Sequence, residues 1–325
     1  MSSRKSGLTG EQPERTAKKS ATVEIPAITC RTKDKLRIGA LALSQDDADA
    51  ARRVTLDELE GYLKSGLPES QADIILCSAF VLTGVSASDG ATVAAKVVAA
   101  AMRPVLLEWE VRGNANTWFM ATGQGLFTIR HDQYIKEVKE IRPRSKEVLR
   151  ELAQGRGRIE VRNHRDLDRL VLFICNEAKL LSAFRLKKIW KDETDEAKKE
   201  LDEALARVMD RRWALLHPAH RPYVGYAARS GGDLVLPKTY RRREGGEVVE
   251  STEYAARLQS IIDQPLAFGR DLVGPKYVLH AGSFRQTAAD RDVSTVMFTA
   301  RGRRKATLWT EAAGDVEIRY AEFEV

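Results

Sequence analysis

The chain has 325 residues, of which 43% are hydrophobic and 30% charged, and its formal net charge is +7. That length is enough for one large domain or two smaller ones with a hydrophobic core. No apolar stretch reaches the roughly 18 residues that cross a bilayer, and the polar N-terminus lacks the apolar segment of a secretory signal, so we expect no membrane partner.

The cysteines and the distribution of charge indicate the cellular compartment and the domain organisation. Cys30, Cys77 and Cys175 are too few and too scattered for a disulfide framework, which favours a reduced, cytoplasmic protein. Most of the positive charge lies in residues 1–35, which carry a net +4 and leave +3 for the rest of the chain. Their polar composition predicts a disordered basic tail at 1–35, in front of one folded domain at 36–325.

The first half of the chain alternates apolar strands with amphipathic helices. The expected elements are strands at 36–43, 72–78 and 104–111, helices at 44–66 and 90–102, and a hairpin at 116–131 that turns at Gly123–Gly125. This order, β-α-β-α-β-β, predicts an α/β layered fold in which helices cover a sheet.

The second half continues this pattern and ends in antiparallel strands. Leu170–Ile174 is an apolar run that predicts a buried strand, with Cys175 at its end. Residues 194–210 predict a charged amphipathic helix. The remaining expected elements are a strand at 213–220 and C-terminal strands that turn at Arg301–Gly302 and Ala313–Gly314.

Cys175 is the most informative residue of the sequence. A strand-to-helix turn would push its side chain out of the sheet toward a substrate, and the start of the following helix would stabilise a thiolate. Free cysteines are also common as buried hydrophobic residues, so position alone leaves both roles open. Lys136, just beyond the hairpin, would favour a neighbouring thiolate, although a lone lysine is more often a solvated charge.

Together these segments resemble the nitrilase superfamily, the carbon–nitrogen hydrolases. The motifs "ADIILCSAFVLTG", "NTWFMATGQGLFTIRHDQYIK" and "LVLFICNEA" occur in the family's order and rough spacing within residues 36–180. The resemblance implies an α-β-β-α sandwich and a Glu–Lys–Cys triad that hydrolyses or transfers nitriles and amides without a cofactor or metal. By motif, Cys175 matches the nucleophile, and Lys136 matches the lysine that steadies the tetrahedral intermediate.

The glutamate of this triad is missing. In "SAFVLTG", Ser78 and Ala79 stand at the positions of the family's Pro-Glu pair, while the following Leu-Thr-Gly keeps the register. General base catalysis contributes about 10²–10⁴-fold in rate. We therefore expect a catalytically impaired protein unless another acid has taken over.

Other carboxylates could replace the lost acid. Glu147 matches a second acid near the site in many family members, and Glu110 lies at a strand end. At most one of Glu108 and Glu110 is expected to face the site. Glu140 follows the lysine, and Glu177 lies two residues after the cysteine.

The region after the cysteine departs from the family and carries the candidate ligand contacts. Glu177, His217 and His220 are expected to contact a small ligand, because the family's strand here leads into the substrate pocket. The histidines could instead cap a strand, and without a third ligand nearby they do not predict a metal site. The inserted helix around 191–210 would form a lid or docking surface.

Two surface features bear on partners. The basic clusters "RPRSK", "YRRRE" and "RGRRK" suggest nucleic acid, but interleaved acids and the lack of a binding motif favour a solvated face. The apolar C-terminal segment, with Val316, Ile318, Tyr320 and Phe323, predicts a homo-oligomer or protein complex that covers an exposed strand edge.

Three functions follow from these observations. The leading one is a nitrilase-fold pseudoenzyme that binds a small ligand and works as a component of an assembly. The second is an active thiol-dependent amidohydrolase or acyltransferase that uses a relocated carboxylate. The third, based on the basic tail, is a nucleic-acid-associated accessory protein.

Overall fold

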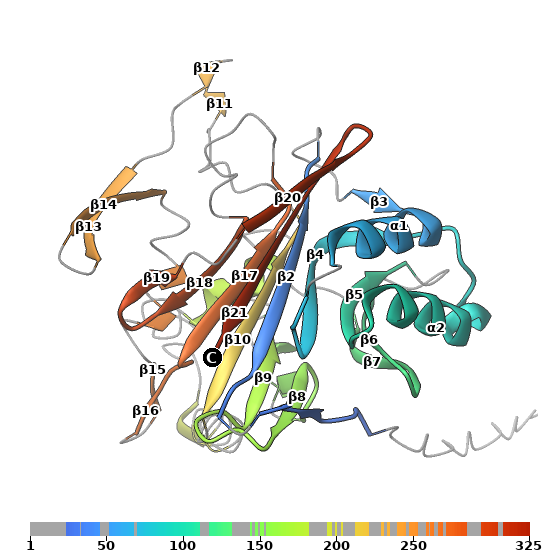
Figure 1. The fold of residues 1–325 in the computed structure, drawn as a ribbon. Coiled ribbons are helices and arrows are strands. Elements are labelled where there is room, and N and C mark those ends of the chain that lie inside the picture. Colours follow the sequence, from blue (N-terminus) through green and yellow to red (C-terminus); the bar gives the residue numbers. More distant parts are fainter. Residues whose placement is uncertain are drawn as a thin grey trace, which may run out of the picture.

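The computed structural model contains two large β-sheets, helices on one of them and several short hairpins (Figure 1), so the protein belongs to the mixed α/β class. The structure describes residues 24–32, 34–45, 52–67, 70–110, 117–131, 144, 147–148, 150–152, 154–181, 194–196, 199, 203, 212–220, 229–230, 233–234, 239–244, 247–252, 258–259, 261–262, 266–268, 271–284, 294–304 and 308–325.

The first sheet has eight strands. They are β2 (Arg37–Leu43), β3 (Arg53–Val54), β4 (Ile74–Leu82), β5 (Val105–Trp109), β6 (Thr117–Thr122), β7 (Gly125–His131), β20 (Leu308–Ala313) and β21 (Val316–Glu324). Their order is β20-β21-β2-β4-β5-β6-β7, with β3 beside β4. The central strands β2, β4 and β5 are parallel and buried on both faces, which explains their continuous apolar sequences.

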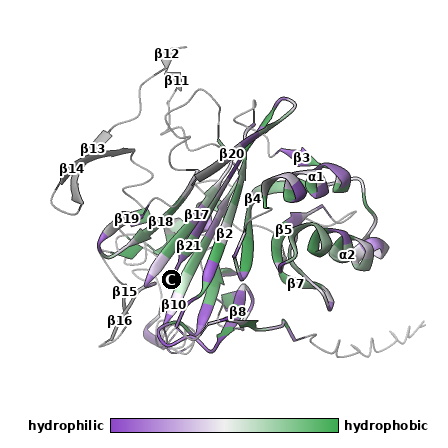
Figure 2. Cartoon of the chain, in the orientation of Figure 1, coloured by the Kyte–Doolittle hydropathy of each residue, from purple (hydrophilic) through white to green (hydrophobic). Residues whose placement is uncertain are grey.

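Two helices, α1 (Leu56–Gly66) and α2 (Gly90–Ala101), pack side by side on the outer face of this sheet (Figure 1). Leu59 and Leu63 of α1 are fully buried one turn apart, as an amphipathic helix requires. Figure 2 shows that α1 carries both hydrophilic and hydrophobic residues, whereas the buried strand β4 is largely hydrophobic. Within the described part of the chain, no helix is long and apolar enough to cross a membrane.

The second sheet has seven strands, ordered β1-β8-β9-β10-β17-β18-β19. They are β1 (Ile28–Thr29), β8 (Arg158–Arg162), β9 (Arg169–Leu172), β10 (Trp213–Ala219), β17 (Tyr277–Gly282), β18 (Thr295–Thr299) and β19 (Gly302–Arg304). The inner strands β9, β10 and β17 are parallel.

The remaining short elements complete the inventory. They are the 3₁₀ helices η1 (Ala87–Asp89) and η3 (Cys175–Leu181), and the hairpin strands β11 (Arg229–Ser230), β12 (Asp233–Leu234), β13 (Thr239–Glu244), β14 (Glu247–Thr252), β15 (Leu266–Phe268) and β16 (Asp271–Val273). The hairpins pair as β11–β12, β13–β14 and β15–β16.

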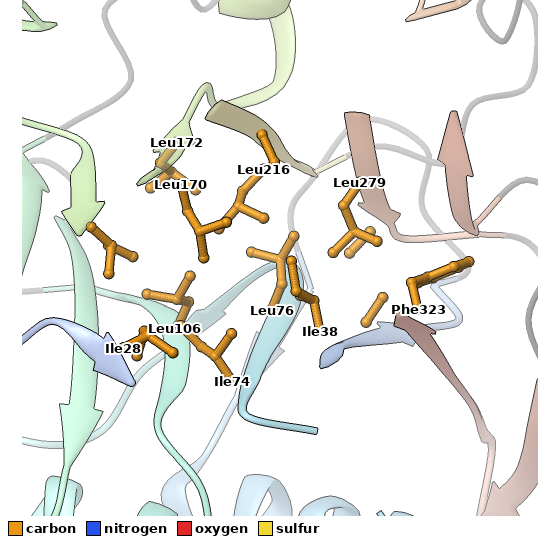
Figure 3. Close-up of a cluster of buried hydrophobic side chains, with 14 of the residues drawn as sticks. Ile28, Ile38, Ile74, Leu76, Leu106, Leu170, Leu172, Leu216, Leu279 and Phe323 are labelled. Atoms are coloured by element: carbon orange, nitrogen blue, oxygen red, sulfur yellow. The ribbon is translucent and has the colours of Figure 1, made fainter. Parts of the chain in front are cut away.

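The main core lies between the two sheets (Figure 3). Leu76 and Leu106 of the first sheet pack in one cluster with Leu172 and Leu216 of the second, and all four are fully buried. Ala79 and Cys175 belong to the same cluster. The inner faces of the sheets therefore form one continuous apolar layer, to which the strands of the three family-like motifs contribute together with β5, β10, β17 and β18.

Two predicted boundaries differ from the structure. The helix expected over 44–66 begins only at Leu56, because Arg53–Val54 pair with the end of β4 and Thr55 caps the helix. The Thr55 hydroxyl accepts from the Glu58 N–H (3.3 Å), and the Glu58 carboxylate accepts from the Thr55 N–H (2.7 Å), forming a capping box. The strand expected to end at residue 78 continues through Ala79 to Leu82.

Both ends of the chain depart from expectation. Residues 24–32, which the sequence placed in a disordered tail, include β1, and Ile28 and Cys30 are buried in the core. The apolar residues of "IPAITC" supply this contact, and residues 1–23 lie outside the described part. At the other end, β21 lies between β20 and β2. The C-terminal strand therefore has no exposed edge for a second copy to cover, because β20 and β2 of the same chain pair with both of its sides.

Candidate active site

Polar side chains from both sheets meet where the parallel strands end. Glu108 is near the end of β5, Cys175 follows β9, and His220 follows β10. Ligand sites in α/β folds commonly form at the carboxyl ends of parallel strands, where side chains are no longer held in the sheet. The contacts among these three residues make this edge the candidate active site.

Glu108 and His220 form a largely buried ion pair across the two sheets. The His220 Nε2 lies 3.0 Å from Glu108 Oε1 and 2.7 Å from Oε2. The exposed fractions of the two side chains are 14% for His220 and 2% for Glu108. Burial disfavours a charge on His220, but the Glu108 carboxylate and hydrogen bonds to Glu108 and Cys175 outweigh it and raise its pKa from 6.5 to about 10. At neutral pH the ring is therefore an imidazolium.

His220 also hydrogen-bonds the side chain of Cys175. Because its Nε2 faces Glu108, the other ring nitrogen, Nδ1, is left for the sulfur. A protonated imidazole beside a cysteine favours the thiolate, which is the nucleophilic form. The three side chains thus form a line in which Glu108 holds His220 and His220 holds the Cys175 sulfur.

The backbone at Cys175 is in an unusual conformation. Its φ is +48°, in the left-handed region that residues other than glycine rarely adopt. Such a conformation costs of order 1–3 kcal/mol and persists only where the surroundings impose it. Cys175 is also the first residue of the seven-residue 3₁₀ helix η3 rather than the residue before a long helix. The chain therefore makes a sharp bend at the candidate nucleophile, and two buried groups hold that bend.

The first of these groups is the ion pair between Arg130 of β7 and Glu177 of η3. Arg130 Nη2 donates to Glu177 Oε1 (2.9 Å), and Nη1 lies 2.7 Å from Oε2. Arg130 Nη1 also donates to the Leu172 carbonyl (3.3 Å), and the Ile174 N–H donates to Glu177 Oε2 (3.0 Å). Both charged side chains are at most 1% exposed. The pair therefore anchors the backbone immediately before Cys175.

The second group is a pair of buried histidines, His217 of β10 and His280 of β17. The His217 Nε2 donates to the Cys175 carbonyl (2.8 Å), and the Nδ1 atoms of the two rings are 2.9 Å apart. Burial, and then the neighbouring His217, hold the pKa of His280 well below 6.5. His217 therefore contacts the backbone of Cys175 itself, and His280 supports His217 from the neighbouring strand.

The other residues predicted for the site lie in different environments, and some of them lie outside the described part of the chain. Ala79 is fully buried in the same inter-sheet cluster as Cys175, on the strand that carries the glutamate in the family motif. Lys136 lies outside the described residues, as do Glu140 and most of the helix expected at 194–210. Glu147 is described and exposed. Glu110 lies just past the end of β5 and pairs with Arg53 at the surface, so its carboxylate is engaged away from the buried edge.

Two expected ligand contacts have a different setting in the structure. Glu177 is fully buried against Arg130 and the Ile174 N–H, which occupies both carboxylate oxygens. His217 is fully buried between the Cys175 carbonyl and His280. Both residues therefore hold the cysteine turn, and neither presents its polar atoms to a ligand at the surface.

Sequence reasoning missed three contributors, although each carried a signal. Glu108 was considered only as a direct replacement for the lost acid, yet it acts on His220. Arg130 and His280 each follow apolar residues within their strands, "GLFTIRH" and "YVLHAG". A charged or imidazole side chain in such a run must find a buried partner, because leaving it unpaired is costly.

Neither a known family nor a metal site identifies the function of this edge. No protein-family model matches the chain, and no curated protein matches it. Among the described residues, no group of three or more His, Cys, Asp or Glu side chains is arranged to hold a metal ion. Any assignment of function therefore depends on the motifs and on the geometry of the site.

Proposed function

We propose that the protein is a thiol-dependent acyl-transfer enzyme, an amidohydrolase or acyltransferase, with Cys175 as nucleophile, His220 as general acid and base, and Glu108 as the carboxylate that orients and charges His220. The observation that carries the proposal is His220, which contacts the Cys175 side chain and the Glu108 carboxylate at once. A nucleophile, a base within hydrogen-bond reach and a third group that orients the base are the parts that nucleophilic catalysis needs.

The chemistry follows from this arrangement. The Cys175 thiolate attacks the carbonyl carbon of an amide or ester and forms a C–S bond. The imidazolium of His220 then gives its Nδ1 proton to the leaving nitrogen or oxygen as the bond to that atom breaks. A thioester remains on Cys175. Neutral His220 next takes a proton from water or an acceptor amine, which attacks the thioester and releases the acyl group.

Glu108 sets the protonation state and the orientation that His220 needs for these proton transfers at neutral pH. It raises the pKa of His220 to about 10, so that the resting ring is protonated and ready to act as an acid. It also fixes the ring by contacting Nε2 with both carboxylate oxygens, and we assign the contact with the sulfur to the other nitrogen, Nδ1. Without this carboxylate, only Cys175 would oppose the burial that lowers the pKa of His220.

The same proposal includes the nitrilase-type α-β-β-α sandwich, in which the acid has moved. Two sheets packed face to face, helices α1 and α2 on the outer face of one of them, and a cysteine after a central strand support it. The family position on β4 holds Ala79, while Glu108 reaches the site from the neighbouring strand β5 through His220. This arrangement favours the active alternative over the pseudoenzyme that the sequence alone placed first.

Thiol alkylation with iodoacetamide tests the proposal without a known substrate. The rate is measured for Cys175 by peptide mass spectrometry at about pH 6, where a free thiol with a pKa of about 8.5 is almost fully protonated. We expect rapid alkylation in the wild-type protein and a loss of at least about tenfold in Glu108→Gln, which removes the charge that supports His220.

Glu110→Gln is the matched control, because it neutralises the exposed glutamate two residues away and should leave the rate unchanged. Cys30 and Cys77 serve as internal references, since burial raises the pKa of both thiols. Alkylation of Cys175 no faster than a free thiol, or no response to Glu108→Gln, would contradict the proposal and favour the binding protein.

A further inference from the structure

Two buried histidines lie side by side on neighbouring strands behind the candidate nucleophile. His217 and His280 are register partners in the parallel pair β10–β17. Their rings stack with centroids 5.1 Å apart and planes inclined by 30°. Both side chains are at most 1% exposed, in strands that are otherwise apolar. Two imidazoles buried together need a defined arrangement of protons, because each nitrogen either donates or accepts.

Their hydrogen bonds fix that arrangement. A carbonyl oxygen only accepts, so the His217 Nε2 carries the proton that it donates to the Cys175 oxygen (2.8 Å). In the same way, the His280 Nδ1 carries the proton that points to the His217 carbonyl (3.1 Å). The His217 Nδ1, 2.9 Å from the His280 Nδ1, is then the acceptor of a neutral ring. The chain of donors runs from His280 to His217 and ends on the backbone of Cys175.

The surroundings keep His280 neutral and in place. Burial and the adjacent His217 hold the pKa of His280 well below its usual value. Gly282 leaves space for the ring, since a Cβ at that position would lie 2.6 Å from the His280 Nε2. Atoms that close essentially never occur, so a larger residue would displace the imidazole.

We propose that His217 and His280 are positioning residues that hold the backbone of Cys175 in its left-handed conformation and so keep the sulfur against His220. This inference rests on the proposed role of Cys175 as the nucleophile. His217 contacts the carbonyl of Cys175, and His280 contacts His217, so the pair is linked to the nucleophile through its backbone. A displacement of about 1 Å at a reacting group can lower a rate about 10²-fold.

An apolar variant and a hydrogen-bonding variant at each histidine distinguish a positioning role from a role in filling the core. His217→Leu removes the donor to the Cys175 carbonyl, whereas His217→Gln places an amide N–H where Nε2 was. His280→Leu and His280→Asn form the second pair, because the Asn amide lies where Nδ1 was. The probe is again iodoacetamide, with alkylation of Cys175 followed by mass spectrometry and folding checked by circular dichroism.

We expect the two Leu variants to lower the alkylation rate of Cys175 by about 10–100-fold, and Gln and Asn to restore most of it. Gly282→Ala, which keeps both histidines but crowds His280, should lower the rate in the same direction. The imidazole ¹⁵N shifts of the wild-type protein should show Nε2–H for His217 and Nδ1–H for His280.

These outcomes separate this inference from the proposed function. Wild-type alkylation at the rate of a free thiol contradicts the function, while the ratio of each variant to wild type still decides the positioning role. Leu variants that react at the wild-type rate overturn the inference, as does failure of both Gln and Asn to recover any rate. If the Leu variants do not fold, Gly282→Ala and the imidazole shifts decide, and the opposite tautomers overturn it.

Discussion

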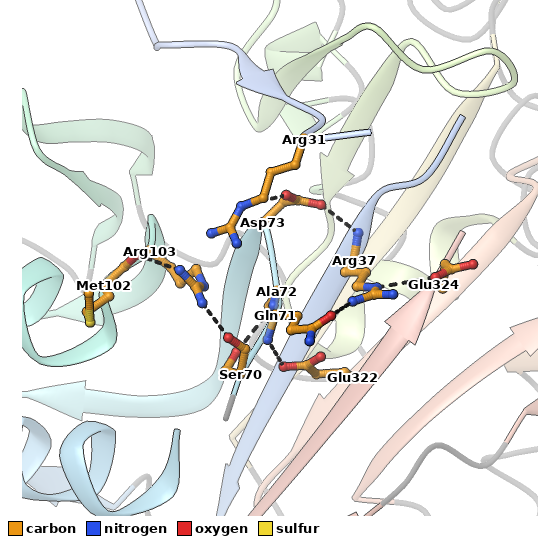
Figure 4. A network of polar contacts seen from close by, with 10 residues as sticks. All are labelled: Arg31, Arg37, Ser70, Gln71, Ala72, Asp73, Met102, Arg103, Glu322 and Glu324. Atoms are coloured by element: carbon orange, nitrogen blue, oxygen red, sulfur yellow. Dashed lines mark hydrogen bonds and ion pairs between the residues drawn. The ribbon is translucent and has the colours of Figure 1, made fainter. Parts of the chain in front are cut away.

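The two edges of the sheets use charged residues in different ways. Where β2 and β4 begin, Arg37 joins a network in which its guanidinium pairs with the exposed Glu324 and its backbone N–H donates to the buried Asp73 (Figure 4). Glu324 pairs with Lys35 at 2.9 Å, and their side chains are 43% and 54% exposed. Where the parallel strands end, Arg130 and Glu177 pair at 2.7 Å with both side chains at most 1% exposed.

This difference in exposure determines how strongly each ion pair stabilises the structure around it. An exposed pair is stabilised weakly because water competes for both partners. A buried pair loses its hydration and is retained only with good geometry, and an apolar replacement of both partners can be equally stable. The buried Arg130–Glu177 pair lies beside the bend at Cys175, whereas the exposed pairs of Glu324 with Lys35 and Arg37 lie where β2 begins. The proposed function uses the edge with the buried pair, and the exposed pairs contribute only to local order.

The largest effect should follow from removing the base. His220→Ala should lower the rate at which p-nitrophenyl acetate acylates Cys175 by about 10²–10⁴-fold, because no group then transfers the proton. His164→Ala is the matched control, since the His164 Nε2 contacts the carbonyl of Val325 at the opposite edge. The release of p-nitrophenolate reports the rate. Equal rates in wild type and His220→Ala would place the base elsewhere.

Breaking the buried ion pair should destabilise the fold strongly. Arg130→Met leaves the Glu177 carboxylate buried and unpaired, so the free energy of unfolding should fall by about 3–5 kcal/mol. The double variant Arg130→Met, Glu177→Gln should recover part of this loss, because a neutral amide can still accept from the Ile174 N–H. Urea unfolding measures both. A change below about 1 kcal/mol in the single variant would mean that the pair behaves like a surface pair.

A glutamate at the position of Ala79 should not increase the reactivity of Cys175. Ala79 is fully buried between the sheets, so Ala79→Glu should lower the free energy of unfolding by a few kcal/mol, because a carboxylate enters an apolar layer. The alkylation rate of Cys175 should fall or stay unchanged. Ala79→Leu controls for added volume without charge. A clear rise in alkylation would show that β4 still supports an acid and that Glu108 has not replaced it.

The buried histidines should make stability depend on pH in two windows. The folded pKa of His220 is raised to about 10, so its stabilising contribution is full below about pH 6.5 and is lost as the pH rises toward about 10. The folded pKa of His280 is lowered, so stability falls as the pH drops below about 6.5, where only the unfolded state gains this proton.

Urea unfolding across this range measures both windows. The alkaline loss should largely disappear in Glu108→Gln, because His220 then has no carboxylate to hold its charge. An alkaline loss that persists unchanged in Glu108→Gln would assign it to other groups.

The smallest effect should come from the exposed edge. Glu324→Gln removes the surface pairs with Lys35 and Arg37, and the free energy of unfolding should fall by less than about 1 kcal/mol. High salt should reduce even this difference, because it screens exposed charges. Thermal unfolding at low and high salt measures it. A loss as large as that of Arg130→Met would remove the distinction between the two edges.

Much of the architecture could be predicted from local sequence. The apolar runs at 36–43 and 72–78, the Ala/Val-rich helix and the Gly123–Gly125 turn lie close to their observed places, because burial and turn chemistry are local properties. The start of α1 was misjudged, because Val54 continues the apolar spacing of the helix but pairs with β4.

The site could be predicted only in part. Cys175 stood out because it ends an apolar run, and His220 because it follows another. Their partnership with Glu108 joins strands from different sheets, and no local pattern encodes that approach. Likewise, His217 and His280 become neighbours only through the register of β10 and β17. Residues that are far apart in sequence meet through strand order, and strand order is a property of the whole fold.

An NMR titration of the His220 imidazole tests the central claim most directly, because the ring connects Cys175 to Glu108. The account predicts an imidazolium that persists to about pH 10 in the wild-type protein, and a clearly lower pKa in Glu108→Gln, where only Cys175 opposes the effect of burial. Titration of His220 near pH 6.5 in both proteins would contradict the account, because the ring would then be neither charged by Glu108 nor held against the Cys175 sulfur.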